Sequence, residues 1–167
     1  MNSYQKYIEL AGKLRALDAL VIEVKDIVID ARTLLKCMYG CSSWNHNLTC
    51  PSAPGALKPW EFEPILNRYH KAILIHCDTK ALSQKISFEL ERQAFVDGYY
   101  FAFSLSDCCI CKECSYPEPC CNQSKARPAM QGVGIDVFAT VRKQGLPIKT
   151  LAVEEENPNW YSLVLIE

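Results

Sequence analysis

The sequence predicts a fold of the α/β or α+β class, with a central mixed sheet flanked by helices in a single domain. Three observations support this prediction. Segments with helical periodicity alternate with short runs of β-branched residues, which indicates helices layered against a sheet. The 167 residues are 49% apolar and 22% charged, a composition typical of one globular domain over residues 1–167. Ten cysteines gather mainly in two segments of poor periodicity, at about residues 37–59 and 107–128.

The first third of the chain begins with an amphipathic pattern. Apolar residues at three- and four-residue spacing predict a helix over residues 3–17, with Ser3 as its N-cap. The β-branched run over residues 19–29 predicts one or two strands. Residues 37–59 have no clear periodicity and contain several prolines and glycines, so they are expected to form a loop that begins at a strand end.

The middle of the chain predicts two further helices and two strands. A short helix is expected over residues 60–69, with Pro64 within its first turn or so, and a strand over residues 72–76. Helical spacing continues over residues 81–96 and ends at an Asp-Gly pair. The unbroken aromatic and apolar run of residues 99–105 is typical of a central strand covered on both faces.

The last third begins with the second cysteine-rich loop, over residues 107–128, which leaves the end of a predicted strand. A helix is expected over residues 135–143, with Asp136 near its start and a glycine just past its end. A final strand is expected over residues 160–166. Arg127, at the end of the cysteine-rich loop, is expected to pair with a carboxylate, and clamping of an anion is the alternative.

The charge pattern excludes several classes of function. The 18 basic and 19 acidic residues are spread along the chain and form no basic stripe, so no nucleic-acid partner is predicted. The apolar stretches are far shorter than the ~20 residues of a membrane helix, and residues 1–15 lack the apolar core of a secretory signal. We therefore expect a cytoplasmic protein with no membrane partner, in which thiols stay reduced and disulfides are disfavoured.

The second loop carries the strongest motif. Cys108, Cys111 and Cys114 form C-x-x-C-x-x-C, and Cys120 follows after five intervening residues. Two residues between successive cysteines let the backbone curl so that the thiolates converge, as in [4Fe–4S] clusters. Zinc held by four sulfurs is the alternative, although structural zinc sites usually use two separated C-x-x-C pairs. The spacing therefore favours an iron–sulfur cluster over zinc.

The first loop supplies a second group of cysteines. Cys37, Cys41 and Cys50 have the spacing C-x3-C-x8-C, and a proline follows the last of them. Trp44 stands where a radical-generating cluster of the S-adenosylmethionine type would need its third cysteine, which disfavours that chemistry. In ferredoxins a Cys-Pro supplies the remote ligand of a cluster, so Cys50 completes either a local site or the site in the second loop.

The two loops together supply seven candidate ligands, whereas two all-cysteine [4Fe–4S] clusters need eight. The sequence therefore leaves one cluster or two as alternatives, and His46 or a cysteine outside the motifs would be the eighth ligand. Cys77 closes a predicted strand, where a packed core thiol is expected. Cys109 and Cys121 neighbour presumed ligands, so they are expected to be bystanders. The three histidines are too scattered to predict a facial metal triad.

Four segments give the chain a resemblance to a known family. They read CMYGC at 37–41, TCPS at 49–52, CCICKECSYPEPC at 108–120 and ARPAMQGVGIDVFATVRKQGLPI at 126–148. Over residues 22–151 the chain resembles the "predicted metal-binding protein" family, domain of unknown function 2284. Aligning Arg127 with the arginine of the family's Arg-Pro places the family's fourth cysteine on Cys120. Leu48 and Ala129 differ from the Trp and Ser that the family tends to have. The resemblance implies metal binding without supplying a reaction.

Three functional hypotheses follow from the cysteines. The first is a cytoplasmic iron–sulfur protein that transfers electrons to or from a redox protein partner. The second is an iron–sulfur enzyme in which one cluster keeps an open iron position for a small substrate. The third is a structural zinc module that holds a loop for protein interaction. No nucleotide-binding, hydrolase or metalloprotease motif is present in the sequence, and the sequence predicts no particular oligomeric state.

Overall fold

The computed structural model describes residues 4–151 and 158–167. Four strands form one sheet in the order β1-β2-β4-β3, and every neighbouring pair is antiparallel. The strands are β1 (Asp18–Glu23), β2 (Lys71–Cys77), β3 (Phe103–Leu105) and β4 (Trp160–Leu165). The expected helices and central sheet are therefore present, but the strand directions are antiparallel rather than mixed, so the fold is of the α+β kind.

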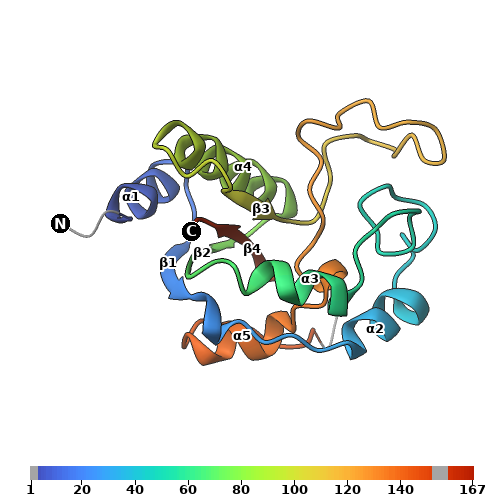
Figure 1. Cartoon of the computed structure of the whole chain (residues 1–167), viewed down its shortest axis with the longest axis horizontal. Helices are drawn as coiled ribbons and strands as arrows, with labels where there is room; N and C mark the ends of the chain where they lie inside the picture. Colours follow the sequence, from blue (N-terminus) through green and yellow to red (C-terminus); the bar gives the residue numbers. More distant parts are fainter. Residues whose placement is uncertain (1–3, 152–157) are drawn as a thin grey trace.

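Helices cover both faces of this sheet (Figure 1). The helices are α1 (Gln5–Lys13), α2 (Arg32–Gly40), α3 (Pro59–Leu66), α4 (Lys80–Val96) and α5 (Val137–Lys143), with short 3-10 turns η1 (Val24–Asp26) and η2 (Gln131–Val133). Alternate residues of β2 enter two different cores. Leu74 packs with residues of α3 and α5, whereas Ile73 and Ile75 pack with α1 and α4. Because both faces of β2 are buried, its residues 72–75 form a continuous apolar run in the sequence.

Several expected elements are confirmed with small shifts of their ends. The strands predicted over residues 72–76 and 160–166 are β2 and β4, and the helix over residues 81–96 is α4. The helix predicted over residues 135–143 begins two residues later, because the Asp136 side chain caps it by accepting from the Ala139 N–H. Helix α1 has Tyr4 at its N-cap, and the predicted cap Ser3 lies outside the described residues.

Three expectations about secondary structure were wrong. The run over residues 99–105 forms only the three-residue edge strand β3, and Tyr100 and Phe101 before it are 70% exposed. Of the one or two strands predicted over residues 19–29, only β1 forms; it ends at Glu23, after which η1 turns the chain and Ile29 makes an isolated bridge to Ile135. The first cysteine-rich loop follows helix α2 and not a strand, and Cys37 lies within that helix. An unbroken apolar run is thus no proof of burial.

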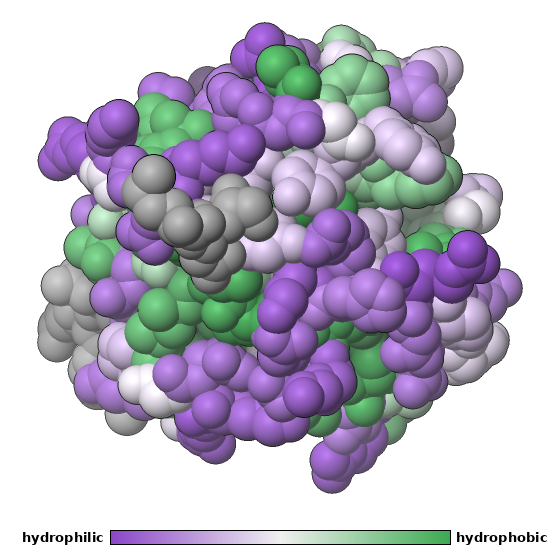
Figure 2. All heavy atoms as spheres, turned by 60° about the vertical axis from the view of Figure 1, so that its left-hand side comes forward, coloured by the Kyte–Doolittle hydropathy of each residue, from purple (hydrophilic) through white to green (hydrophobic). Residues whose placement is uncertain are grey.

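The two cysteine-rich segments lie at the end of the molecule opposite α1 (Figure 1). The first connects α2 to α3, and the second leaves β3 and returns towards η2. On the face turned forward in Figure 2, hydrophilic side chains cover most of the surface and apolar residues appear in separate patches. Among the described helices, none is long and apolar enough to cross a membrane.

Candidate metal centre

All ten cysteines are free thiols in the structure, but they occupy three different environments. Cys77 ends β2 with no exposed surface, and burial, together with nearby Asp78, raises the pKa of its thiol to about 11. It packs with α1 and α4 in the core, as expected from its position at the end of a predicted strand. The other nine cysteines lie in α2 or in the two cysteine-rich segments.

Cys37, Cys41 and Cys50 form the first group. Cys37 lies near the end of α2, Cys41 is the C-cap residue of that helix, and Cys50 follows in the loop. Burial, the largest cause, and the nearby thiols of Cys50 and Cys41 and the carboxylate of Asp107 together raise the pKa of Cys37 to about 11. These groups are therefore close enough to repel one another as anions. Since Asp107 begins the second loop, this group lies beside the second cysteine motif.

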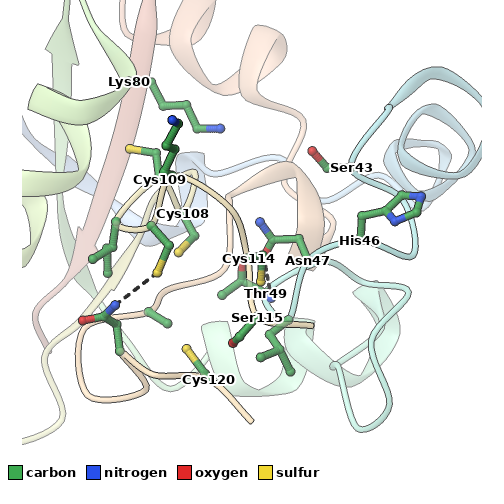
Figure 3. A pocket seen from close by; sticks show the side chains of 16 residues that line it. Ser43, His46, Asn47, Thr49, Lys80, Cys108, Cys109, Cys114, Ser115 and Cys120 are labelled. Atoms are coloured by element: carbon green, nitrogen blue, oxygen red, sulfur yellow. Dashed lines mark hydrogen bonds between the residues drawn. The ribbon is translucent and has the colours of Figure 1, made fainter. Parts of the chain in front are cut away.

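The second group surrounds a cavity of about 300 Å³. The four cysteines predicted as ligands all line it, and Cys109 does too. Those four are Cys108, Cys111, Cys114 and Cys120. The opposite wall comes from the first loop and includes His46, Asn47 and Thr49 (Figure 3). Cys37, Cys41 and Cys50 are not among the lining residues. The fold thus brings two segments that are about 60 residues apart in the chain to one cavity.

Cys121 makes a contact that its position beside Cys120 did not indicate. A turn over residues 121–125 brings its Sγ to 3.7 Å from the Sγ of Cys111. The hydrogen bond to Cys111 raises the pKa of Cys121. Asn122 Nδ2 donates to both sulfurs, at 3.1 Å to Cys111 and 3.4 Å to Cys121. Donors aimed at sulfur stabilise thiolates, so this corner is suited to a metal-bound pair.

Cys109 is held by helix α4. Its backbone N–H and its Sγ both donate to Gln84 Oε1, at 2.8 Å and 3.2 Å. Burial raises the pKa of the Cys109 thiol, while the nearby Lys80 ammonium acts in the opposite direction. Lys80 is the first residue of α4 and lines the thiol cavity. Its positive charge favours anionic sulfur on that side of the cavity.

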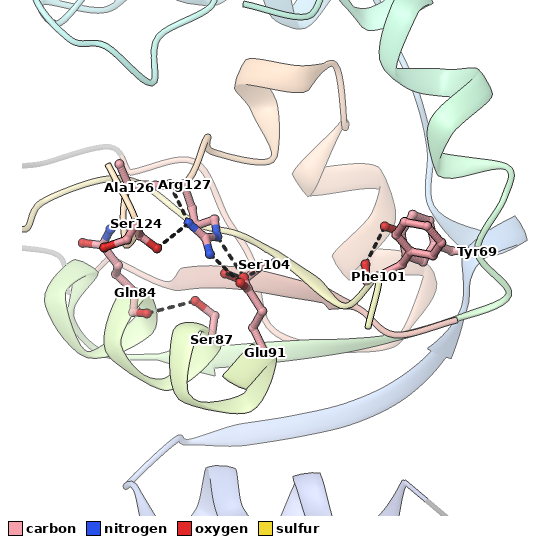
Figure 4. Close-up of polar contacts among 9 residues, drawn as sticks. All are labelled: Tyr69, Gln84, Ser87, Glu91, Phe101, Ser104, Ser124, Ala126 and Arg127. Carbon is pink, nitrogen blue, oxygen red and sulfur yellow. Dashed lines mark hydrogen bonds and ion pairs between the residues drawn. The ribbon is translucent and has the colours of Figure 1, made fainter. Parts of the chain in front are cut away.

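The end of the second loop is anchored by Arg127, which forms the expected pair with a carboxylate (Figure 4). Arg127 Nε donates to Glu91 Oε2 at 2.8 Å, its Nη2 bonds Glu91 Oε1, and each side chain is only 12% exposed. Nη1 also donates to the carbonyls of Ser124 and Ala126. The guanidinium lies about 5 Å from the rings of Phe88 and Phe103. One residue therefore ties the loop to α4 and β3.

The histidines are engaged in different parts of the molecule. The buried His76 bonds Asp18 Oδ2 through Nδ1 and Asn159 Oδ1 through Nε2, each at 2.8 Å, and it stacks on Tyr161. This arrangement joins β1, β2 and the residue before β4 at one end of the sheet. His46 lines the thiol cavity instead, so of these two histidines it is the one placed near the sulfurs.

The donor set fits a soft metal in chemical terms. Five cysteines line the cavity, the Asn122 amide donates to one of them, Cys111, and the Lys80 ammonium lies on the wall. Sulfur ligands with such surroundings select zinc, Cu(I) or iron–sulfur clusters. In the described part of the chain, no three His, Cys, Asp or Glu side chains are gathered closely enough to ligate one ion. Binding would therefore draw the sulfurs closer together.

Comparison with known proteins gives one match. The family model described as predicted metal-binding protein (DUF2284) matches residues 20–166, which include both cysteine-rich segments and all four strands except the first two residues of β1. No curated protein and no solved structure shows significant similarity to the chain. The family match agrees with the thiol-rich cavity but names neither a metal nor a reaction.

Proposed function

Because the chain belongs to the predicted metal-binding protein family DUF2284, we propose that its second loop holds a [4Fe–4S] cluster for electron transfer. The proposed ligands are Cys108, Cys111, Cys114 and Cys120. The observation that carries the proposal is that these four side chains line one cavity of about 300 Å³. When bound, such a cluster supplies one-electron transfer.

The surrounding residues support this role. Asn122 donates to the Cys111 sulfur, and Lys80 adds a positive charge to the wall; both favour thiolate ligands and the reduced state of a centre. The loop lies at the periphery, where Ile110 is 37% exposed. A redox protein could therefore approach the ligands directly. A reducing compartment such as the cytoplasm is part of the proposal, because free thiols persist there.

Cys37, Cys41 and Cys50 would form or complete a second site. Their thiols lie close enough to raise the pKa of Cys37, and a cation among them would relieve that repulsion. Helix α2 and the loop after it supply only these three sulfurs. A four-ligand site therefore needs one further ligand from another part of the chain. Asp107 lies near this group.

A structural zinc site is the second candidate, and one distance favours it. Two sulfurs bound to the same tetrahedral zinc at about 2.3 Å lie roughly 3.8 Å apart. The Sγ atoms of Cys111 and Cys121 are 3.7 Å apart. In this alternative Cys121, rather than Cys120, would be a ligand.

Metal analysis of anaerobically purified protein distinguishes these candidates. The proposal expects about four irons and four sulfides per chain for one cluster, or about eight of each for two, with an EPR signal on reduction. Stoichiometric zinc without iron would overturn it. Cys120→Ser should abolish the cluster of the second loop while Cys121→Ser retains it, and the zinc alternative reverses this order. Cys77→Ala is the matched control, since its thiol lies in the core, and metal content should be unchanged.

A further inference from the structure

A second hollow lies between α4 and the cysteine-rich loop. Its volume is about 570 Å³, and its walls include Gln84, Lys85, Phe88, Ile110 and Lys125. Cys109 and Ile110 line both this groove and the thiol cavity. The groove therefore reaches the cysteine-rich loop without being part of the proposed metal centre. Its volume falls within the range of small-molecule sites.

Gln84 contributes a buried donor without a partner. The residue is only 5% exposed, and within the described ranges its Nε2 has no hydrogen-bond acceptor. The Cys109 backbone N–H donates to the other amide atom of Gln84. Because a backbone N–H can only donate, this bond identifies that atom as oxygen and Nε2 as the free donor. An unpaired buried donor is unfavourable, and because Nε2 itself is covered, a ligand acceptor would satisfy it once the Gln84 side chain turns towards the groove.

The rim of the groove carries unbalanced positive charge. Lys85 and Lys125 are exposed, and their ammonium groups have no ion-pair partner in residues 4–151 and 158–167. Arg92 also lines the groove, but it pairs with Glu89 at 3.2 Å, so these two charges cancel. Phe88 and Ile110 provide apolar surface in the same groove.

We propose that this groove binds a small organic anion that has an apolar body. Its carboxylate or phosphate would pair with Lys85 and Lys125, its body would lie against Phe88 and Ile110, and one acceptor would bond Gln84 Nε2. The volume of about 570 Å³ favours a small ligand, which fits inside the groove, whereas an acidic protein surface would contact the exposed lysines at its edge. The inference is independent of which metal the thiol cavity holds.

Titration with two simple probes tests this proposal. Phenylacetate and phenyl phosphate supply the two anionic groups, and phenylacetamide and phenethylamine are the neutral and cationic controls. In ¹H–¹⁵N NMR spectra of the metal-free protein, either anion should shift the backbone signals of Cys109 and Lys125 and the side-chain amide of Gln84, with saturation. Calorimetry of the protein as purified should give the same order of affinity, with phenylacetamide weaker by roughly tenfold and phenethylamine silent.

Matched variants separate the groove from general charge effects. Lys85→Gln combined with Lys125→Gln should weaken binding of both anions by roughly tenfold or more. Lys13→Gln combined with Lys25→Gln removes the same charge from exposed positions on α1 and η1 and should leave binding unchanged. Gln84→Met should weaken binding and remove the amide signal. The proposal is overturned if no probe gives saturable shifts at millimolar concentration, or if both lysine pairs have equal effects. Binding of poly-glutamate without binding of either small acid also overturns it, in favour of an acidic protein partner.

Discussion

Replacing Arg127 by methionine is expected to lower the free energy of unfolding by about 3–5 kcal/mol, because the change leaves a buried carboxylate without its cation. Glu91 is 12% exposed. It would keep only its hydrogen bonds from the Ser104 N–H and Oγ, at 2.7 Å and 2.6 Å. Methionine is of similar length and still fills the space between Phe88 and Phe103. The expected loss is thus electrostatic in origin and is a large share of a typical domain's stability.

Urea unfolding followed by circular dichroism measures this effect. A double-mutant cycle with Arg127→Met and Glu91→Gln should give a coupling energy of roughly 1–3 kcal/mol. The exposed pair of Arg92 and Glu89, on the same helix at 3.2 Å, is the matched control. Arg92→Met should cost no more than about 0.5 kcal/mol. A loss below about 1 kcal/mol for Arg127→Met, or equal coupling in the two pairs, would refute the reasoning.

The same pair predicts a pH dependence with a definite sign. Burial on its own would raise the pKa of Glu91, but the hydrogen bonds from Arg127 and Ser104 outweigh it and leave the pKa below its usual value. A lowered pKa in the folded state means that the stabilisation is present above the unfolded value of about 4.3. It is lost as the pH falls through the folded value. The stability difference between the unmodified protein and Glu91→Gln should therefore shrink steadily on acidification below about pH 4.3.

Two further predictions concern a thiol and a glycine. Iodoacetamide at neutral pH should label the exposed Cys41 and Cys121 of the metal-free protein. It should not label Cys77, because that thiol is buried and its pKa is raised to about 11. Peptide mass spectrometry measures the labelling, and labelling of Cys77 without unfolding would contradict its place in the core. Gly134→Ala should destabilise the fold by about 1–3 kcal/mol or more, because φ is 100° there and an added Cβ would lie 2.5 Å from Pro59 Cβ. Gly12→Ala, in open space on α1, should instead stabilise it by roughly 0.5–1 kcal/mol, and thermal melts that fail to separate the two variants would refute this reasoning.

The sequence pattern correctly predicted the elements in which the spacing of apolar residues matches the faces that are buried. Helix α4 and strands β2 and β4 were found because their apolar residues meet one or two covered faces. The same logic failed at residues 99–105, where Tyr100 and Phe101 are 70% exposed, since composition alone does not report which surface another layer covers. It also failed at Cys37, because the cysteine and glycine content of this segment indicated a loop, whereas residues 32–40 form the nine-residue helix α2, none of whose residues is buried.

The tertiary contacts of the site could not be predicted from the sequence, because they depend on residues far apart in the chain. The motif in the second loop identified the cysteines, but the contact of Cys121 with Cys111 depends on the turn over residues 121–125. Gln84 lies 25 residues from Cys109, and no spacing rule connects a helical glutamine to a loop amide. The requirement for glycine at position 134 also depends on a tertiary contact. A Cβ there would collide with Pro59, which belongs to another segment of the chain.

One face of α4 organises the second loop at both of its ends. Gln84, Phe88 and Glu91 follow the i, i+4, i+7 spacing of a single helical stripe. Gln84 holds the start of the loop through Cys109, whereas Phe88 and Glu91 hold its end through Arg127. Because α4 packs against the central strands through Ile86 and Leu90 on another face, the loop is attached to the most buried part of the fold. A change in this stripe should therefore alter metal content even though it removes no sulfur, since the positions of the ligands depend on both attachments.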